Sequence, residues 1–501
     1  MVRLAELFGA LGLFADLADG FADEKVIRTV VVAMRIARAA GLPQDELSDV
    51  YYASLLRYAG CVGFSHEEAH EFGGGDDISV RWAMALADPT DPVATVGRIV
   101  RRVGQGRPLF DRARAVARLV SDRSAVARHS RSQCDTAMWL ARIVGSSPTV
   151  LDALSQICER FDGRGAPHGL GGNDLRRSMR VHHIADIAEI VFHREGVEAA
   201  VAETQRRAGK HLDPELTRFV SQATFEGLDG PLVWEAFLAC EPLPHATATG
   251  TEVDTVARAF GALADLKSVY TIGHSARVAR FAKGAAEALG LDSALAERAG
   301  HLHDLGRVAI PNWIWDKPER LGIAERERVQ MHAYYTDRIL RRAGALSEVA
   351  QVAAAAHERP NRGGYPKGEV PTPLADVLAA ADVFAALGEE RPHRPAFSDA
   401  DAKRELARMA AAGELSTRAA DAVLHAAGLG DAPRVSDHGL TAREVEVVRW
   451  LARGKSNREI GSLLGISSRT VQNHVAHVYD KLGLYSRAGA TLWAVERGLL
   501  T

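Results

Sequence analysis

Two distant stretches of this sequence repeat each other, and the repeat limits the possible architecture more than any other feature. CERFDGRGAPHG (158–169) and HERPNRGGYPKG (357–368) align without a gap and share Glu, Arg, Gly, Pro and Gly at matching places. Three flanking pairs of apolar segments match in the same order: 27–42 with 276–291, 54–65 with 300–311, and 183–191 with 378–387. Helices rich in Ala and Leu often look alike, but a shared turn is not explained that way. We therefore infer an internal duplication.

The length and the linkers predict three domains. A chain of 501 residues exceeds what one core usually organises. EPLPHATATGTE (241–252) and GLGDAPRVSDHG (428–439) have the Pro, Thr and Gly content of linkers. Helical spacing recurs and β-branched runs are short, so we predict a mainly α protein. Its expected parts are two tandem helical bundles, at 1–240 and 253–427, and a small helical domain at 438–501.

Cysteine use and hydropathy indicate a cytoplasmic protein without membrane contact. The four cysteines are scattered and form no Cys-x-x-Cys pair, which favours a reducing compartment. The first apolar stretch is interrupted by Glu6 and Asp16, unlike a signal peptide, and no run reaches the ~18 apolar residues of a membrane helix.

Polar residues interrupt the apolar helices of the second copy at five places. Imidazole and carboxylate groups together suit divalent metals such as Fe, Mn or Zn, and helical bundles build such sites from facing side chains. His303 and Asp304, about 100° apart on one helix, can both reach a metal between helices. We expect one or two divalent ions, which bind a phosphate and acidify a water. The candidate ligands are His274, His303, Asp304, His332, His357 and Asp382.

The first copy differs from the second where this chemistry would lie. Only Asp382 keeps its counterpart, Asp186. The counterparts of His274, His303-Asp304 and His357 are Lys25, Arg57-Tyr58 and Cys158. A metal site is therefore expected in the second copy alone, and the first copy is expected to be a scaffold, a dimerisation surface or a ligand pocket.

Residues 266–427 resemble the HD superfamily of metal-dependent phosphohydrolases, whose core ligands H…HD…D correspond to His274, His303, Asp304 and Asp382. They resemble the HD-GYP subfamily more closely, through YTIGHSARVA, HDLGRVAIP, HERPNRGGYP and ADVFAAL. That subfamily hydrolyses cyclic dinucleotides, typically cyclic di-GMP. The resemblance implies a cyclic dinucleotide or related phosphoester ligand and catalytic roles for Asp304 and Arg307. The first copy is similar to a degenerate member, with GAP (165–167) in place of GYP.

Two departures from the family pattern change what this site is expected to do. Ala356 stands where the family has a histidine, so one ligand of a multinuclear site is missing. Arg307 stands where the family has a lysine; arginine can hold a phosphate bidentately but cannot give up a proton. We expect metal binding with altered nuclearity, and hydrolysis stays an open question at this point.

The last 65 residues contain the helix start and stop signals of a small helical domain. They carry nine Lys or Arg against six Asp or Glu. Thr441 and Glu444 form a capping box, and Gly454 can end the first helix. A second helix is predicted over 457–465. The third, within 466–483, is capped by Ser467 or Ser468 and buries the stripe Val471, Val475, Val478 and Leu482.

This stretch resembles the LuxR/GerE-type helix-turn-helix along its whole length, through LTAREVEVV, GKSNREIGSLLGIS, RTVQNHVAHVYDKLG and SRAGA. The resemblance implies a four-helix domain that binds double-stranded DNA with a recognition helix at about 468–483. It also implies a homodimer formed through the last helix, at about 486–498. Gln472 stands where many members have lysine. The candidate DNA-binding residues are Lys455, Ser456, Asn457, Ser468, Arg469, Thr470, Gln472, Asn473, His474 and Lys481.

Three interpretations remain. The first is a transcriptional regulator whose second copy senses, and in some degree hydrolyses, a phosphorylated ligand. The second is a metal-dependent cyclic dinucleotide phosphodiesterase with an accessory DNA-binding domain. The third is a purely structural role for both copies, which the retained core ligands disfavour. Because the DNA-binding pattern is complete and the hydrolase pattern lacks one ligand, we favour the regulator.

Overall fold

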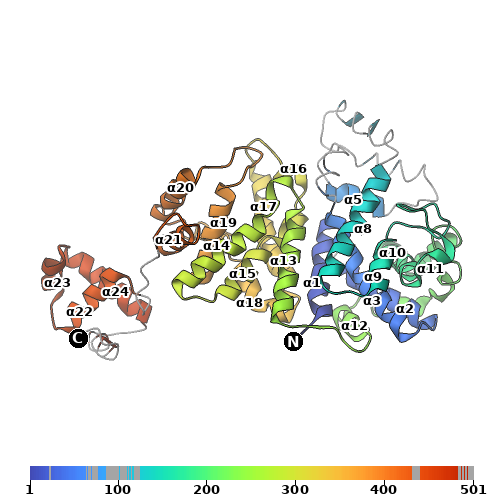
Figure 1. The fold of residues 1–501 in the computed structure, drawn as a ribbon, viewed down its shortest axis with the longest axis horizontal. Helices are drawn as coiled ribbons and strands as arrows, with labels where there is room; N and C mark the ends of the chain where they lie inside the picture. The colour runs from blue at the N-terminus through green and yellow to red at the C-terminus, as the bar shows by residue number, and fades with distance from the viewer. Residues whose placement is uncertain are drawn as a thin grey trace.

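The computed structural model describes residues 1–21, 24–63, 77–85, 125–431 and 440–482, with isolated residues at 65, 69, 97, 101, 110, 112–113, 116–117, 487, 490 and 493–494. The described chain is mainly α, as predicted (Figure 1). Its strands are two short segments, β1 (Val2–Arg3) and β2 (Thr247–Ala248), which pair antiparallel with Val2 opposite Ala248. None of the described helices combines the length and the apolarity needed to cross a membrane.

The first copy is a bundle in which α2 packs against α3 and α10, and α8 packs against the 3₁₀ turn η1. Its helices are α1 (Leu4–Asp19), α2 (Lys25–Ala39), α3 (Gln44–Leu56), α5 (Asp77–Ala85), α8 (Ala125–Ile143), α9 (Pro148–Leu154), α10 (Arg177–Glu195), α11 (Val197–Arg206) and α12 (Val233–Ala239). Its 3₁₀ turns are η1 (Arg57–Val62), η2 (Gly172–Asp174), η3 (Thr217–Phe219) and η4 (Gln222–Phe225).

The second copy repeats this plan, with α14 against α15 and α19, and α17 against the turn η6. Its helices are α13 (Gly250–Asp265), α14 (His274–Leu289), α15 (Ser293–Leu302), α16 (Asn312–Trp315), α17 (Ile323–Arg341), α18 (Ser347–Ala353), α19 (Pro373–Leu387), α20 (Asp399–Ala411) and α21 (Thr417–Ala426). Its 3₁₀ turns are η5 (Val269–Thr271), η6 (Leu305–Ala309) and η7 (Gly344–Leu346).

Matching glycines show how closely the two copies correspond. A Cβ on Gly60 of η1 would lie 2.4 Å from the carbonyl oxygen of Gln133, and one on Gly306 of η6 would lie 2.0 Å from that of His332. In each copy a glycine therefore lets the turn approach the long helix beside it, α8 or α17. The same contacts pair Gln133 with His332, a correspondence that the sequence alignment did not supply.

The two copies share one hydrophobic core, and α1 packs on helices of both. Figure 1 shows α1 at the boundary between them. A buried polar cluster crosses this boundary: Asp77 of α5 lies 2.6 Å from Lys267 Nζ and 2.6 Å from an Arg81 nitrogen. The second oxygen of Asp77 accepts the backbone N–H of Asn312 at 3.0 Å. The copies are thus joined by packing and buried charge as well as by the chain segment 241–252.

The C-terminal helices α22 (Ala442–Ala452), α23 (Asn457–Leu464) and α24 (Ser468–Leu482) form cores of their own, around Val447, Ile460 and Val471. The capping box of Thr441 is confirmed, and Gly454 follows the end of α22 with a φ of 82°. Ser467 is the residue that caps α24, because its hydroxyl accepts the Thr470 N–H. Most of the predicted last helix and most of the linker 428–439 lie outside the described residues.

Candidate metal centre

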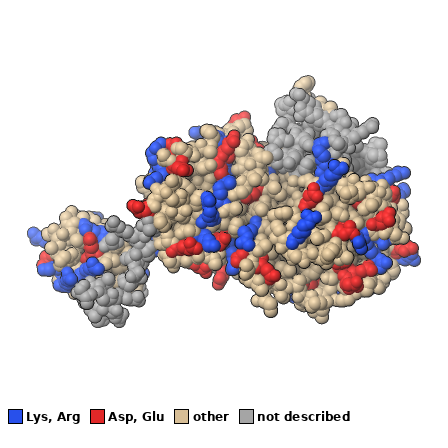
Figure 2. Space-filling view, viewed as in Figure 1, with Lys and Arg blue, Asp and Glu red and all other residues tan. Residues whose placement is uncertain are grey.

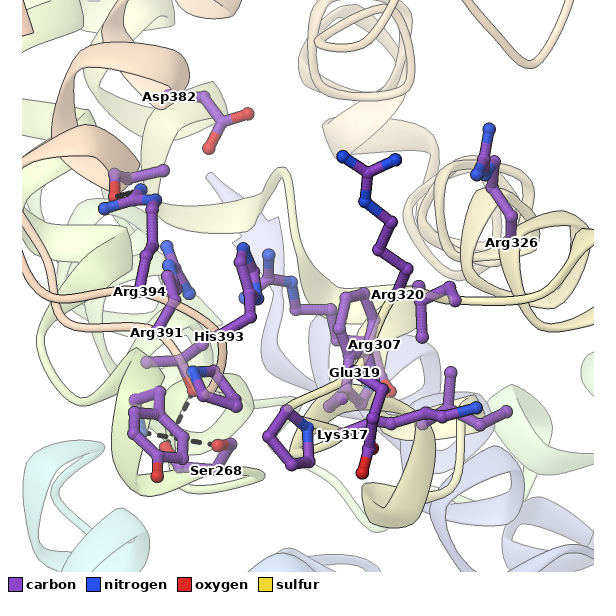
Figure 3. Close-up of a pocket in the computed structure, with 18 residues that line it drawn as sticks. Ser268, Arg307, Lys317, Glu319, Arg320, Arg326, Asp382, Arg391, His393 and Arg394 are labelled. Atoms are coloured by element: carbon purple, nitrogen blue, oxygen red, sulfur yellow. Dashed lines mark hydrogen bonds between the residues drawn. The ribbon is translucent and has the colours of Figure 1, made fainter.

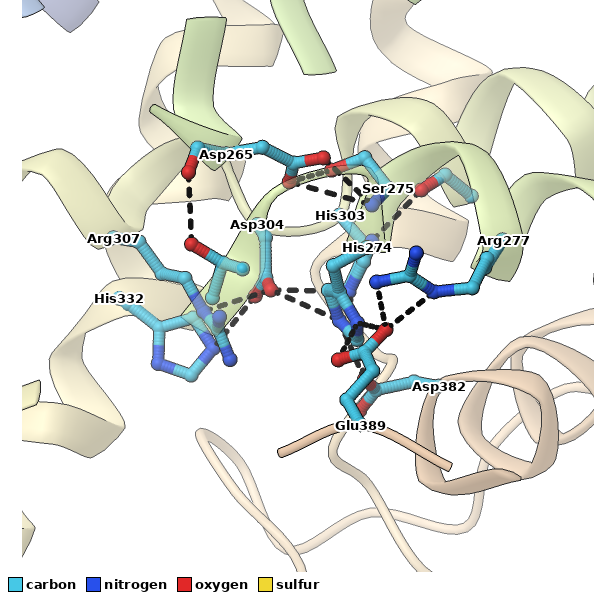
Figure 4. A network of polar contacts seen from close by, with 12 residues as sticks. Asp265, His274, Ser275, Arg277, His303, Asp304, Arg307, His332, Asp382 and Glu389 are labelled. Atoms are coloured by element: carbon cyan, nitrogen blue, oxygen red, sulfur yellow. Dashed lines mark hydrogen bonds and ion pairs between the residues drawn. The ribbon is translucent and has the colours of Figure 1, made fainter. Parts of the chain in front are cut away.

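The six ligands expected in the second copy come together from five parts of the bundle. Figure 4 shows five of them, His274, His303, Asp304, His332 and Asp382. His274 is the first residue of α14, His332 lies in α17, and Asp382 lies in α19. His303 and Asp304 come from the segment between α15 and η6, and His357 follows α18. All six side chains are buried.

The donor atoms form two adjoining groups. In the first, His274 Nε2 lies 3.1 Å from Asp382 Oδ1, and His303 Nε2 lies 3.7 Å from the same oxygen. In the second, His332 Nε2 lies 3.4 Å from Asp304 Oδ1 and 2.8 Å from His357 Nε2. Asp304 links them, because its other oxygen lies 3.3 Å from His303 Nε2. Within each group of three, every donor atom lies within 4.8 Å of the others.

Unsatisfied buried atoms show that these residues fit a divalent metal. His274 Nε2, His303 Nε2 and both oxygens of Asp304 have no hydrogen-bond partner among the described residues, although they lie close to one another. Arg307 Nε is 2.7 Å from Asp304 Oδ2, an ion pair without hydrogen-bond geometry. Buried polar atoms in this condition are costly, and divalent cations bound at this centre would supply the missing partners.

The outer nitrogens of three histidines are held by hydrogen bonds that direct Nε2 inward. His303 Nδ1 bonds to the Gly300 carbonyl at 2.8 Å, and His332 Nδ1 bonds to the Val329 carbonyl at 2.5 Å. His274 Nδ1 lies 3.0 Å from a carboxylate oxygen of Glu389, which also binds Arg277 and Arg391. Partners of this kind fix the tautomer and orientation of metal-binding histidines.

The two aspartates are anionic in this setting. Burial alone would raise the pKa of Asp304, but Arg307 and His303 hold that pKa well below its ordinary value. Burial likewise opposes ionisation of Asp382, whose pKa is held well below the ordinary value by His274 and His303. Two buried carboxylates at the centre therefore favour a cation between them.

The expectation that His303 and Asp304 lie on one helix is wrong. Helix α15 ends at Leu302, His303 is its C-cap, and Asp304 precedes η6 with a φ of −108° and a ψ of 13°. The physical reason is the contact of Gly306 with the His332 carbonyl, which requires the chain to turn tightly here. Gly306, two residues after the pair, was the sequence signal for this break. Both side chains still reach the centre.

The GGYP segment, residues 363–366, positions His357. A Cβ on Gly364 would lie 2.4 Å from the His357 carbonyl oxygen, so only glycine fits there without a shift. The Glu358 carboxylate accepts the backbone N–H groups of Lys367 and Glu369, at 2.7 and 2.9 Å. The Tyr365 ring then stacks on the His357 imidazole with centroids 4.8 Å apart.

A cavity of about 810 Å³ opens beside Asp382 (Figure 3). Tyr270 and Trp315 contribute flat apolar surface to it, and the Arg307 guanidinium lies 4.6 Å from the Trp315 ring centroid. Cations dominate its lining: Arg307, Lys317, Arg320, Arg326, Arg391 and Arg394, against the acids Glu319 and Asp382. Guanidinium groups are the preferred partners of phosphate oxygens.

Sequence reasoning missed Glu389, Arg391 and Arg394. They lie in GEERPHRP, directly after α19, and this run of charges looks like an ordinary solvated loop. In the structure Glu389 is buried behind His274, and Arg394 donates to the carbonyls of Ala386 and Leu387. The available signal was position: the run follows the helix that carries Asp382.

The predicted DNA-binding residues lie on α23, α24 and the segments before them. Arg469, Thr470, Gln472 and Asn473 are exposed on α24, and His474 is half-buried. Figure 2 shows Lys and Arg side chains at the surface of this part of the chain.

Three further candidates already have partners within the domain. Ser456 caps α23 together with Glu459, and Lys455 lies 3.4 Å from the Glu459 carboxylate. Lys481 lies 2.7 Å from the buried Glu444 carboxylate. Asn457 is the first residue of α23 and Ser468 the first of α24.

Comparison with known proteins identifies two regions of the chain. Residues 258–415 match the HD domain, and residues 438–494 match the bacterial regulatory proteins of the luxR family. The chain combines an HD domain with a luxR-family domain. Its helical fold also matches a crystal structure of a cyclic GMP-AMP specific phosphodiesterase from Vibrio cholerae, with a TM-score of 0.59 and 25% identity over 86% of this chain and 99% of the other.

Two relatives are similar to different parts of this HD–luxR chain. The 3'3'-cGAMP-specific phosphodiesterase 3 of Vibrio cholerae is 28% identical over 394 residues, which cover 76% of this chain and 85% of the relative. The transcriptional activator protein AnoR of Acinetobacter nosocomialis is 41% identical over 61 residues, 12% of this chain and 26% of the relative. The chain is thus homologous to a phosphodiesterase over most of its length and to transcriptional regulators at its C-terminal end.

Proposed function

We propose that this protein is a DNA-binding transcriptional regulator whose second copy binds a divalent metal and a cyclic dinucleotide. The observation that carries the proposal is the set of unsatisfied buried donor atoms beside a cavity lined by cations. In this scheme residues 253–427 bind the ligand and residues 438–501 bind double-stranded DNA as a homodimer. Residues 1–240, the first copy, pack on the ligand-binding second copy.

The metal would be held by His274, His303, Asp304 and Asp382, with His332 and His357 completing a second position. Iron and manganese suit this mixture of imidazole and carboxylate. When bound, such an ion polarises phosphoryl oxygens and acidifies a water near neutral pH. One or two ions are compatible with the two groups of donor atoms.

The ligand's phosphates would be held by the arginines of the cavity. Arg307 is placed between Asp304 and the cavity, so it can hold a phosphate oxygen next to the metal. Tyr270 and Trp315 offer surfaces on which a base can stack. The Vibrio relative is named for 3'3'-cGAMP, so cyclic GMP-AMP is the first ligand to test, with cyclic di-GMP beside it.

Hydrolysis is proposed to be slow. Ala356 is completely buried immediately before His357 and has no atom that can bind a metal. Arg307 lies 2.7 Å from Asp304 and, as an arginine, cannot donate a proton to a leaving group. Ligand binding needs only the metal and the cations of the cavity. Turnover also needs the attacking and leaving oxygens to be held in place. Changes that slow cleavage can therefore leave ligand binding intact.

The first experiment compares wild type, Asp304→Ala and Ala356→His, with Asp337→Ala as the control. Asp337 pairs with Arg341 on α17, the helix that carries His332, at a half-exposed position outside the ligand set. Elemental analysis and calorimetric titration with cyclic GMP-AMP should show metal and ligand lost from Asp304→Ala and kept in the control. Ala356→His should raise the rate of hydrolysis. Wild-type protein without metal, after expression with iron and manganese supplied, contradicts the proposal.

The second candidate function is an ordinary phosphodiesterase, which the similarity to the Vibrio enzyme favours. Single-turnover and steady-state rates separate the two. Wild-type turnover on the order of 10 per second, typical of enzymes, assigns the site to catalysis rather than sensing.

Regulation is tested by selecting sequences from random DNA with the purified full chain. A preferred sequence whose binding is lost in Thr470→Ala supports the regulator. The absence of any sequence preference by the dimeric protein refutes it.

A further inference from the structure

The first copy contains a cavity where the second copy has its metal centre. The cavity measures about 500 Å³, within the range of small-molecule sites. It is lined by Lys25, Arg57, Tyr58, Cys158 and Asp186, the counterparts of second-copy metal ligands. The first copy has therefore kept the cavity but has different side chains at the positions of the metal ligands.

The replacements favour an anion over a cation. Lys25 Nζ donates to the Tyr58 hydroxyl at 2.7 Å and forms an ion pair with Asp186. The Tyr58 hydroxyl in turn donates to Asp186 at 2.5 Å, so the one retained carboxylate is already occupied. Arg57 adds a second positive charge, 3.9 Å from Asp186. A metal ion here would meet two cations in place of two imidazoles.

The Arg57 guanidinium has N–H donors that are not used in close hydrogen bonds. Its side chain is largely buried, and its Nε has no hydrogen-bond partner among the described residues. Its polar contacts are long, 4.0 Å to Cys61 Sγ and 3.9 Å to Asp186, and its guanidinium carbon lies 4.5 Å from the Tyr58 ring centroid. A guanidinium carries five N–H donors in a plane that matches two oxygens of a phosphate. A buried arginine so loosely paired is suited to a bound anion.

The mouth of the cavity adds charge of the same sign. Arg160 and the exposed Arg164 line it from the loop that corresponds to the GGYP segment. The Glu159 carboxylate in that loop accepts the backbone N–H groups of His168 and Gly169, at 2.6 and 3.2 Å, as Glu358 does for its own loop. One oxygen of this carboxylate, Oε1, is thus held by the loop, while Oε2 has no hydrogen-bond partner among the described residues.

We propose that the first copy binds a phosphorylated nucleotide without a metal. The phosphate would lie against Arg57 and Lys25, and the base against the ring of Phe21 and the side chain of Ile157, which also line the cavity. The recognised chemistry is a phosphate ester. Its source is either an intact cyclic dinucleotide or a mononucleotide, and inorganic phosphate is the minimal form of the same anion.

The experiment uses full-length Asp304→Ala in EDTA, so that the second copy's centre cannot contribute. Equilibrium dialysis with labelled cyclic GMP-AMP and with labelled GMP should show one bound nucleotide per chain, displaced by millimolar inorganic phosphate. Whichever nucleotide binds identifies the source. If neither binds, the inference is overturned. The proposed function is unaffected by that result, because it is tested in metal-loaded wild type.

Two variants in the same background locate the site. Arg57→Leu should weaken nucleotide binding about ten- to a hundredfold, as expected for loss of hydrogen bonds to a charged group. Arg164→Ala, at an exposed position that the fold does not need, should weaken it severalfold and reduce its salt dependence. Arg206→Ala, an exposed arginine paired with Glu203 on α11, is the control and should change nothing. Unchanged binding in Arg164→Ala and in folded Arg57→Leu contradicts the assignment.

Discussion

Lys267 is expected to be among the most destabilising positions to change, because it joins the two copies through buried charge. Its side chain is 2% exposed, and its Nζ lies 2.6 Å from the fully buried Asp77 carboxylate and 3.2 Å from the Val308 carbonyl. Removing one partner of a buried ion pair typically costs about 3–5 kcal/mol, because the remaining charge stays desolvated.

The structure ranks two substitutions within that range. In Lys267→Met the Asp77 carboxylate keeps Arg81 at 2.6 Å, so we expect a loss near the lower end, about 3 kcal/mol. In Asp77→Asn both Lys267 and Arg81 lose the carboxylate that they share, so we expect about 5 kcal/mol or more. The double variant should cost less than the sum, because it removes charge of both signs.

The assay is urea unfolding of the full chain followed by tryptophan fluorescence, with Lys283→Met as the matched control. Lys283 forms an exposed ion pair with Glu297 at 2.8 Å, and such pairs contribute little to stability. If Lys267→Met and Lys283→Met unfold at the same urea concentration, the buried pair does not hold the copies together. If Asp77→Asn lowers the free energy of unfolding by less than Lys267→Met does, the ranking is refuted.

Three further results are expected. Arg469→Ala should cost about 1–3 kcal/mol of operator binding and relax specificity, whereas Lys455→Ala should weaken all sequences alike and reduce the salt slope by about 1, both measured by fluorescence anisotropy. Glu389→Gln should lower metal affinity about 10–100-fold by weakening the hold on His274, measured by competition with a chelating dye. Gly364→Ala should lower the unfolding free energy by about 1–3 kcal/mol, because its Cβ meets backbone, while Gly344→Ala, with open space around it, should not.

The fold was predictable because its signals are local and repeated. The helical spacing, the duplicated turn and the caps at Thr441 and Gly454 each depend on a few neighbouring residues, and the structure confirms them. The break between His303 and Asp304 was missed because apolar periodicity continues across it. The deciding contact, Gly306 against the His332 carbonyl, joins segments that are distant in sequence.

The candidate site was predictable as a set of residue types but not as a geometry. A histidine or aspartate inside an apolar helix is visible in sequence, and all six of those named in the second copy lie in the two groups of donor atoms. Glu389 and the cavity arginines lie in a charged segment, where solvated side chains are the ordinary expectation. Only the path of the chain after α19 places Glu389 against His274. The Asp77–Lys267 pair was hidden for the same reason, since its partners come from different copies.

The two copies retain the same backbone contacts and differ in charge. Gly165 and Gly364 each lie so close to the backbone at the start of their own loop that a Cβ would not fit. The carboxylates of Glu159 and Glu358 each accept backbone N–H groups from the same loop. Asp186, the counterpart of Asp382, is also retained. In the first copy an ammonium from the protein neutralises this carboxylate, and Lys25 and Arg57 hold its pKa well below the ordinary value against the effect of burial. In the second copy His274 takes the place of Lys25, so Asp382 lies against imidazoles rather than an ammonium, while Arg307 pairs with Asp304. The cavity is therefore lined by different charged groups in the two copies, which is the basis for the different sites proposed for them.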